Sequence, residues 1–119
     1  MSHLFEASGE SIWFPALRVG RLYLAAVDGL SAVLGVESGL TTDRSDTSRI
    51  EPAAFERFTR AVFAAHFGTS HPELRLLTLG PLVVSLALLE KLGVTLQAAD
   101  PEQAAVLAKA REHGIRFPT

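Results

Sequence analysis

Four histidines are the first side chains to consider for metal binding or proton transfer: His3, His66, His71 and His113. His66 and His71 are five residues apart with Gly68 between them, so they lack the four-residue spacing that places two metal ligands on one helix face. One interpretation puts both in a ligand-binding cleft. The plainer one makes His66 a helix residue beside an apolar stripe and His71 a polar residue in a first helical turn. His3 and His113 lie near the ends, where we expect them to be solvated.

Asp43 and Asp46 stand three residues apart in a stretch rich in Ser and Thr, a composition that superficially suggests an oxygen-rich cation site. Arg44 lies between them, where a cation site would disfavour a positive charge, and no EF-hand pattern follows. We therefore expect a solvated loop whose Asp and Ser side chains bond local backbone amides. A pair of carboxylates for acid and base catalysis could be drawn from Asp46, Glu51 and Glu56, but only if folding brings them into one cleft.

The sequence contains no recognisable nucleophile or phosphate-binding motif. Cysteine is absent, no serine lies in a G-x-S-x-G setting, and Gly20 and Gly35 belong to no glycine-rich loop. Arg18 and Arg21 share a helix face and could bind an anion, although a solvated face is the plainer interpretation. We predict no cofactor.

Trp13 and Tyr23, the only Trp and the only Tyr, lie close together in the sequence. An aromatic side chain in this place is usually a packing anchor that fastens strands to helices. If Trp13 is exposed instead, it is the best single candidate for a contact with a protein partner.

The elements that would position these residues are mostly helical. Residues 3–14 alternate weakly around Ser8-Gly9 and predict a short β-hairpin. A helix is predicted over 16–34, ending at Gly35, with charged and small residues opposite an apolar face made of Leu17, Leu24, Val27, Leu30 and Leu34. Residues 36–51 are polar and aperiodic, so they form either a functional loop or a segment that hides one short strand near 47–51.

Three further helices are expected in the second half of the chain. Pro52 is suited to begin a helix that Gly68 ends. Ser70 and Glu73 have the spacing of a capping box, which predicts a third helix to about residue 92, with a kink near Pro81. Another capping pattern at 100–103 predicts a helix from 101 to about 113, after which Ile115 and Phe117 could dock. The predicted fold is mainly α (α+β): about four helices in a compact bundle with a small N-terminal hairpin.

Composition limits the class of protein. The chain has 119 residues, 48% of them hydrophobic, with a formal net charge of −2 and a mean hydropathy of +0.25. This length suits a single domain over 1–119. The absence of cysteine excludes a disulfide framework. The sequence has no run of basic residues, so we do not expect it to bind nucleic acid. The high apolar content suggests that part of the surface is covered by another subunit.

No basic and then apolar leader pattern is found at the start of the sequence, so a cytoplasmic location is expected. The most apolar run, residues 76–89, is shorter than the roughly 18 residues that a membrane span needs. We therefore expect this run to be a buried helix and the protein to have no membrane partner.

Several short motifs resemble a family of small actinobacterial proteins of unknown function, over about residues 4–93. The motifs are Ile12-Trp13-Phe14-Pro15, Gly20-Arg21-Leu22, Ile50-Glu51-Pro52 with Phe55 and Phe58, and then His71 and Gly80. The family pattern has Trp-x-Pro near the start and Ile-Asp-Pro before the second helix. Glu51 replaces that Asp here, and Glu is the poorer N-cap residue. The resemblance implies a bacterial cytoplasmic protein and transfers no catalytic residue.

Three functions remain open from the sequence. The favoured one is a non-enzymatic protein-interaction module that forms a homodimer through its third helix or the Trp13 region. The second is a small enzyme or ligand-binding protein of specialised metabolism, with a cleft between the hairpin, residues 36–51 and the second helix. The third is an immunity or antitoxin protein that blocks an effector. The tentative binding residues are Trp13, Arg21, Asp43, Asp46, Arg49, His66 and His71.

Overall fold

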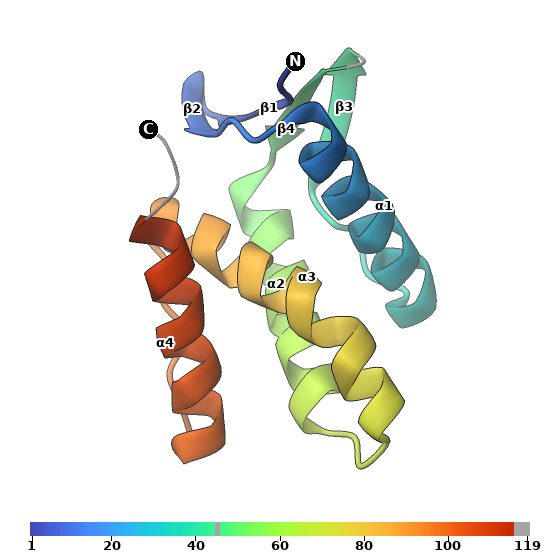
Figure 1. The fold of residues 1–119 in the computed structure, drawn as a ribbon, viewed down its shortest axis with the longest axis vertical. Coiled ribbons are helices and arrows are strands. Elements are labelled where there is room, and N and C mark those ends of the chain that lie inside the picture. Colours follow the sequence, from blue (N-terminus) through green and yellow to red (C-terminus); the bar gives the residue numbers. More distant parts are fainter. Residues whose placement is uncertain (45, 116–119) are drawn as a thin grey trace.

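The computed structural model describes residues 1–44 and 46–115, and the side chains of Arg44 and Ile115 are not among the described parts. The order of elements is β1 (Leu4–Ala7), β2 (Glu10–Trp13), α1 (Leu17–Leu34), β3 (Leu40–Arg44), β4 (Thr47–Ile50), α2 (Pro52–Phe67), α3 (Pro72–Lys91) and α4 (Pro101–Ile115). Two hairpins thus precede three consecutive helices, with α1 between the hairpins. Figure 1 shows the sheet at one end of the molecule and the helices extending away from it.

The predicted N-terminal hairpin is confirmed. β1 and β2 pair antiparallel, and Ser8 and Gly9 both adopt positive φ, at 52° and 82°. Two successive residues with positive φ give the tight turn whose twist matches the flanking strands. The chain then enters α1 at Leu17, and Gly35 ends this helix in the left-handed conformation, as glycine permits.

The short strand expected near 47–51 is confirmed as β4, and an unpredicted strand, β3, pairs with it, so that residues 36–51 contain a second hairpin. β3 and β4 pair antiparallel, and β4 also pairs with β1 in parallel. The resulting sheet has the order β2-β1-β4-β3. The prediction of a small hairpin was therefore incomplete, because two hairpins join into one four-stranded sheet.

The predictions for the starts of the helices are only partly correct. Glu51 caps α2: its carboxylate accepts a hydrogen bond of 2.6 Å from the amide of Ala54, and Pro52 follows it. The predicted capping box before α3 is wrong. His71 is the N-cap residue and its side chain makes no capping bond, whereas the Thr69 hydroxyl accepts from the His71 amide.

The capping pattern before α4 is confirmed, but its predicted end is not. Asp100 accepts a hydrogen bond from the Gln103 amide at 2.9 Å, and the Gln103 side chain accepts from the Ala99 amide at 2.8 Å. The helix continues through Gly114 to Ile115. The proposed docking of Ile115 and Phe117 lies outside the described side chains and residues.

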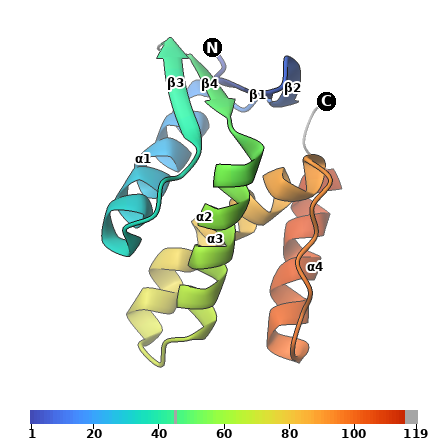
Figure 2. The same ribbon diagram turned by 180° about the vertical axis from the view of Figure 1, so that it is seen from behind.

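The four helices are confirmed, but their arrangement in a single bundle is not. α3 lies in the middle and packs most extensively on α2 and α4, whereas α1 makes smaller contacts with α2 and α3. Figure 2 shows α2 in front of α3, with α1 and α4 on opposite sides. The buried side chains come from both the sheet and the helices, among them Phe5, Trp13, Phe55, Phe58 and Leu88. One core therefore runs from the inner sheet face into the helices.

α3 ends within one residue of the predicted position, and its sequence is strongly apolar. One 18-residue window has a mean hydropathy of 1.5, which by length and composition would suffice to cross a membrane, and 44% of that window is buried within the protein. A core helix passes the same test. The C-terminal half of α3 is buried from Leu86 to Leu89, while its N-terminal half carries exposed leucines.

Candidate functional site

An apolar groove lies between α1 and α3. Its volume is about 320 Å³, and it is lined by Trp13, Val19, Leu22, Tyr23, Ala26, Gly80, Pro81 and Val84. Trp13 and Tyr23 are themselves buried and form its floor, with their rings in edge contact at 5.6 Å between centroids. The lining contains no charged residue. Such a groove can hold an apolar side chain or ligand, but it offers little polar specificity.

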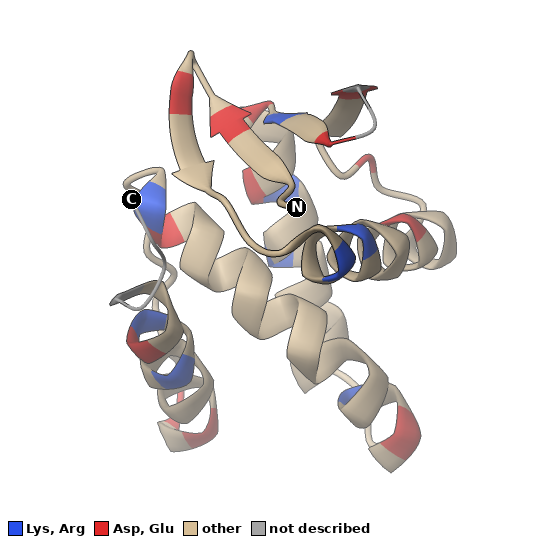
Figure 3. Ribbon diagram, turned by 45° about the horizontal axis from the view of Figure 1, so that its top comes forward, with Lys and Arg blue, Asp and Glu red and all other residues tan. Residues whose placement is uncertain are grey.

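Large apolar side chains are exposed around this groove. Leu22 and Val33 on α1 are 73% and 79% exposed, and Leu76 and Leu77 on α3 are 74% and 73% exposed. Residues 76–89 of α3 carry no charge, and Figure 3 shows this helix as a long uncharged ribbon between charged ends. Large exposed apolar side chains beside an apolar groove are typical of a site of interaction.

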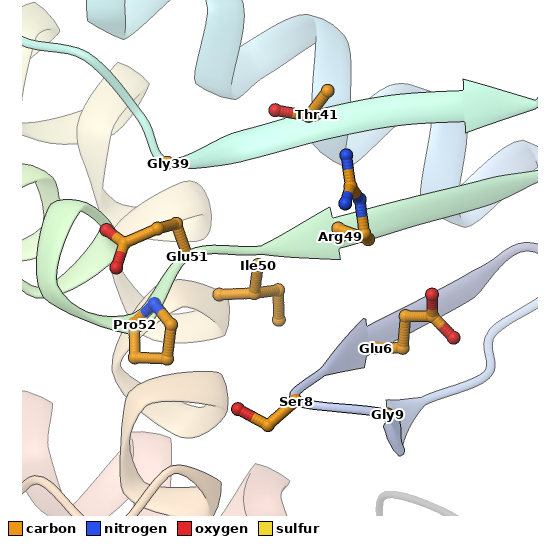
Figure 4. A pocket seen from close by; sticks show the side chains of 9 residues that line it. All are labelled: Glu6, Ser8, Gly9, Gly39, Thr41, Arg49, Ile50, Glu51 and Pro52. Atoms are coloured by element: carbon orange, nitrogen blue, oxygen red, sulfur yellow. The ribbon is translucent and has the colours of Figure 1, made fainter.

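A second, polar hollow lies on the outer face of the sheet. Figure 4 shows the residues that line it, which come from β1 and the turn after it, β3 and the glycine before it, β4 and the start of α2. The volume is about 470 Å³. Glu6 and Thr41 are register partners of Arg49 on either side of β4, which places all three on the same sheet face. The hollow therefore contains a mixed set of charges, and Glu51, at its rim, is engaged in capping α2.

The structure brings together only two of the predicted site residues. Arg49 and Asp43 form an ion pair of 2.7 Å on the exposed face of the second hairpin. Asp46 is exposed and accepts a hydrogen bond of 3.3 Å from the Thr47 hydroxyl. Arg21 is exposed on α1. Among the predicted residues only Arg49 lines the polar hollow.

His66 and His71 have different surroundings. His66 is buried, and its Nδ1 atom forms a hydrogen bond of 2.7 Å with the Thr78 hydroxyl of α3. Burial lowers the pKa of His66, and the nearby Arg75 lowers it further. His71 is exposed at the start of α3. His66 thus joins α2 to α3, and neither histidine lines the polar hollow.

The expectation that His3 is solvated is wrong. His3 is 1% exposed, and its Nε2 atom lies 2.8 Å from the Ser48 hydroxyl of β4. Its Nδ1 atom is buried and has no hydrogen-bond partner. Burial lowers the pKa of His3, against an opposing effect of Asp46. The side chain packs closely on α1, where a Cβ atom built on Gly20 would lie 2.6 Å from the Cβ atom of His3.

Trp13 is a packing anchor, as the plainer interpretation held. It is 6% exposed and stacks on Phe5 with 5.1 Å between ring centroids. Tyr23 is also buried, and its hydroxyl lies 2.6 Å from that of Ser85 on α3. Burial raises the pKa of Tyr23 well above its ordinary value. The same two aromatic residues thus support both the core and the groove floor.

Metal binding finds no support in the described part of the chain, where no group of three or more His, Asp or Glu side chains is placed to hold an ion. Of the carboxylates considered as a catalytic pair, Glu51 caps α2 and Glu56 forms an exposed ion pair with Arg60 at 3.0 Å. Each thus has a structural contact of its own.

The exposed apolar stripe of α1 was not predicted from the sequence. The predicted buried face consists of Leu17, Leu24, Val27, Leu30 and Leu34, with charged and small residues on the opposite face. A second apolar set at intervals of three and four residues was visible between these faces: Val19, Leu22, Ala26, Gly29 and Val33. This spacing is the signal that could have identified the surface.

The comparisons with known proteins define the family but no activity. The model of a family of unknown function, DUF6086, matches residues 1–119. The chain belongs to this family, which agrees with the resemblance to small proteins of unknown function. No curated protein matches the chain. No solved structure matches it either.

Proposed function

We propose that this protein is an interaction module that acts as a homodimer, with the apolar face of α1 and α3 as its contact surface. The observation that carries the proposal is the exposure of Leu22, Leu76 and Leu77, each at 73–74%, beside an apolar groove. Val33 extends the same surface along α1. The favoured hypothesis from the sequence, contact through the third helix or the Trp13 region, falls on this surface.

The energetics favour a partner for these side chains. Burying a leucine side chain completely contributes about 1.5–3 kcal/mol, so three-quarters of that, about 1–2 kcal/mol, is available from each exposed leucine. A symmetric dimer buries each of them twice, once per copy. The three leucines of the two copies together contribute about 6–12 kcal/mol, which is comparable with an association cost on the order of 4–15 kcal/mol.

The test is the solution mass measured by light scattering from about 1 to 100 µM protein. We expect a dimer for the native chain and a monomer for Leu22→Asp and for Leu77→Asp, because each variant places a charge in the contact. Ala108→Asp is the matched control: it adds the same charge at an exposed position of α4 and should leave the dimer intact.

A native chain that remains monomeric at 100 µM would refute the proposal. Lipid vesicles provide a second arm, because the composition of α3 also passes the test for a membrane helix. A monomer that sediments with vesicles, and loses this property on Leu77→Asp, would assign the apolar face to a bilayer instead. A dimer that does not sediment with vesicles supports the protein contact.

A further inference from the structure

The exposed stripe of α1 has the spacing of a helix-pairing seam. Val19, Leu22, Ala26, Gly29 and Val33 recur at alternating intervals of three and four residues. This is the spacing with which two helices pack side by side along their length. Val19, Leu22 and Val33 are exposed by 50%, 73% and 79%. The described residues therefore leave most of the stripe uncovered.

We infer that α1 packs antiparallel against α1 of a second copy, about a two-fold axis at Ala26. The inference rests on the proposed homodimer and specifies how its copies are oriented. In this arrangement Val19 is level with Val33 of the other copy, Leu22 lies within one residue of the level of Gly29, and Ala26 faces its own counterpart. Each contact occurs twice, as two-fold symmetry requires.

The sizes of the side chains favour the antiparallel direction. Leu22 is large and exposed, and a Cβ atom built on Gly29 would have no neighbour within 4 Å. An antiparallel pair places each leucine over the other copy's glycine, so a bulky group fills an open position. A parallel pair places leucine against leucine and glycine against glycine. The second arrangement leaves a void at Gly29, and voids in a contact forfeit packing energy.

The charges beside the stripe favour the same direction. Arg18 and Arg21 flank the N-terminal half of α1, and Asp28 flanks its C-terminal half on the same side. In the antiparallel pair Arg21 lies within one turn of Asp28 of the other copy. In a parallel two-fold pair the charged flanks of the two copies lie on opposite sides of the seam, so Arg21 does not meet Asp28 of the other copy. All three side chains belong to exposed residues, so they are free to adopt these positions.

The groove beside α1 widens this contact. A standard interface buries about 800 Å² on each partner, roughly an eighth of the 6791 Å² surface of this chain. The α3 wall of the groove, with Gly80 and Val84, adjoins the stripe through the residues that both share. In an antiparallel pair the two α3 helices lie on the same side of the α1 pair, and their exposed leucines join the buried area.

Disulfide trapping tests the relative direction of the two α1 helices. Because the native chain has no cysteine, any disulfide between two copies must come from the introduced cysteine. Two copies of residue 19 lie 14 residues apart along an antiparallel pair, about 21 Å at 1.5 Å per residue. That distance exceeds the roughly 7 Å between Cα atoms that a disulfide can span. We expect Ala26→Cys to form a covalent dimer under mild oxidation, whereas Val19→Cys and Val33→Cys do so only when mixed with each other.

Ala32→Cys, exposed on the charged flank of α1, is the matched control and should not link. Light scattering of each reduced variant separates the two levels of the proposal. A dimer in which Val19→Cys and Val33→Cys each link to themselves would show a parallel pair and overturn this inference alone. A dimer that links at none of the three positions would place the contact elsewhere and overturn it too. A monomeric native chain would overturn the proposed function itself.

Discussion

The N-terminal segment approaches α1 closely at Gly20. We therefore predict that Gly→Ala changes the stability of the protein in opposite directions at Gly20 and at Gly29 of the same helix. Alanine in place of glycine inside a helix normally stabilises it by about 0.8–1.0 kcal/mol. At Gly29 a new Cβ atom would meet nothing within 4 Å, so the full gain is expected. At Gly20 the Cβ atom would lie 2.6 Å from the Cβ atom and 3.0 Å from the Cγ atom of His3.

The magnitude follows from this overlap. Non-bonded carbon atoms prefer separations of about 3.5–4.0 Å, and His3 cannot rotate away, because its Cβ atom is fixed by the backbone. The His3 amide donates a hydrogen bond of 2.9 Å to the Pro15 carbonyl. Overpacking of this kind costs about 1–3 kcal/mol. Gly20→Ala should therefore be less stable than Gly29→Ala by about 1–3 kcal/mol, or about 4–12 °C in Tm for a domain of this length.

Urea and thermal unfolding, followed by the fluorescence of Trp13, measure this difference. Both substitutions should be made in the Leu22→Asp background, so that association does not contribute to the stability of Gly29→Ala. Equal stability of the two variants would refute the described contact between His3 and α1. A Gly20→Ala variant more stable than its parent would refute it more strongly.

Two further predictions concern the buried polar groups. Burial lowers the pKa values of His3 and His66 in the folded protein, so the unfolded chain binds more protons than the folded one as pH falls below about 6.5. The free energy of unfolding should therefore decrease by at most about 1.4 kcal/mol per histidine at pH 5.5 relative to pH 7.5. Urea titrations that give equal stabilities at both pH values would contradict this. Tyr23→Phe leaves the Ser85 hydroxyl without its partner at 2.6 Å and should lower the free energy of unfolding by about 1–3 kcal/mol. Adding Ser85→Ala should restore part of this loss. A double variant no more stable than Tyr23→Phe alone would show that the unpaired Ser85 hydroxyl does not cause the loss.

The sequence predicted those elements whose ends are set by local chemistry. The first hairpin follows from a Ser8-Gly9 turn that tolerates positive φ, and α2 follows from Glu51 and Pro52 at its start. The second hairpin was missed because one face of β3 and β4 is open to solvent and polar. Thr41 and Arg49, register partners on that face, have no apolar alternation to reveal a strand.

The surroundings of the candidate site residues could not be predicted, because they depend on contacts between distant segments. His3 is buried and forms a hydrogen bond with Ser48, which lies 45 residues further along the chain. Its position near the start of the sequence does not indicate this burial. His66 is buried through Thr78 across the turn between α2 and α3. The outward stripe of α1 was visible as a spacing, but which of two apolar sets faced the core depended on the packing of Tyr23 and Val27.

The parallel pairing of β1 with β4 has a consequence for the order in which the chain is made. Leu4 pairs with Thr47 and Glu6 with Arg49, so the inner edge of β1 stays open until residues 47–49 have left the ribosome. Closing so long a connection costs chain entropy before any contact repays it. Until then the nascent chain exposes unpaired strand groups that can pair with neighbouring molecules. Slow elongation between β1 and β4 would therefore prolong the interval in which newly made chains are prone to aggregate.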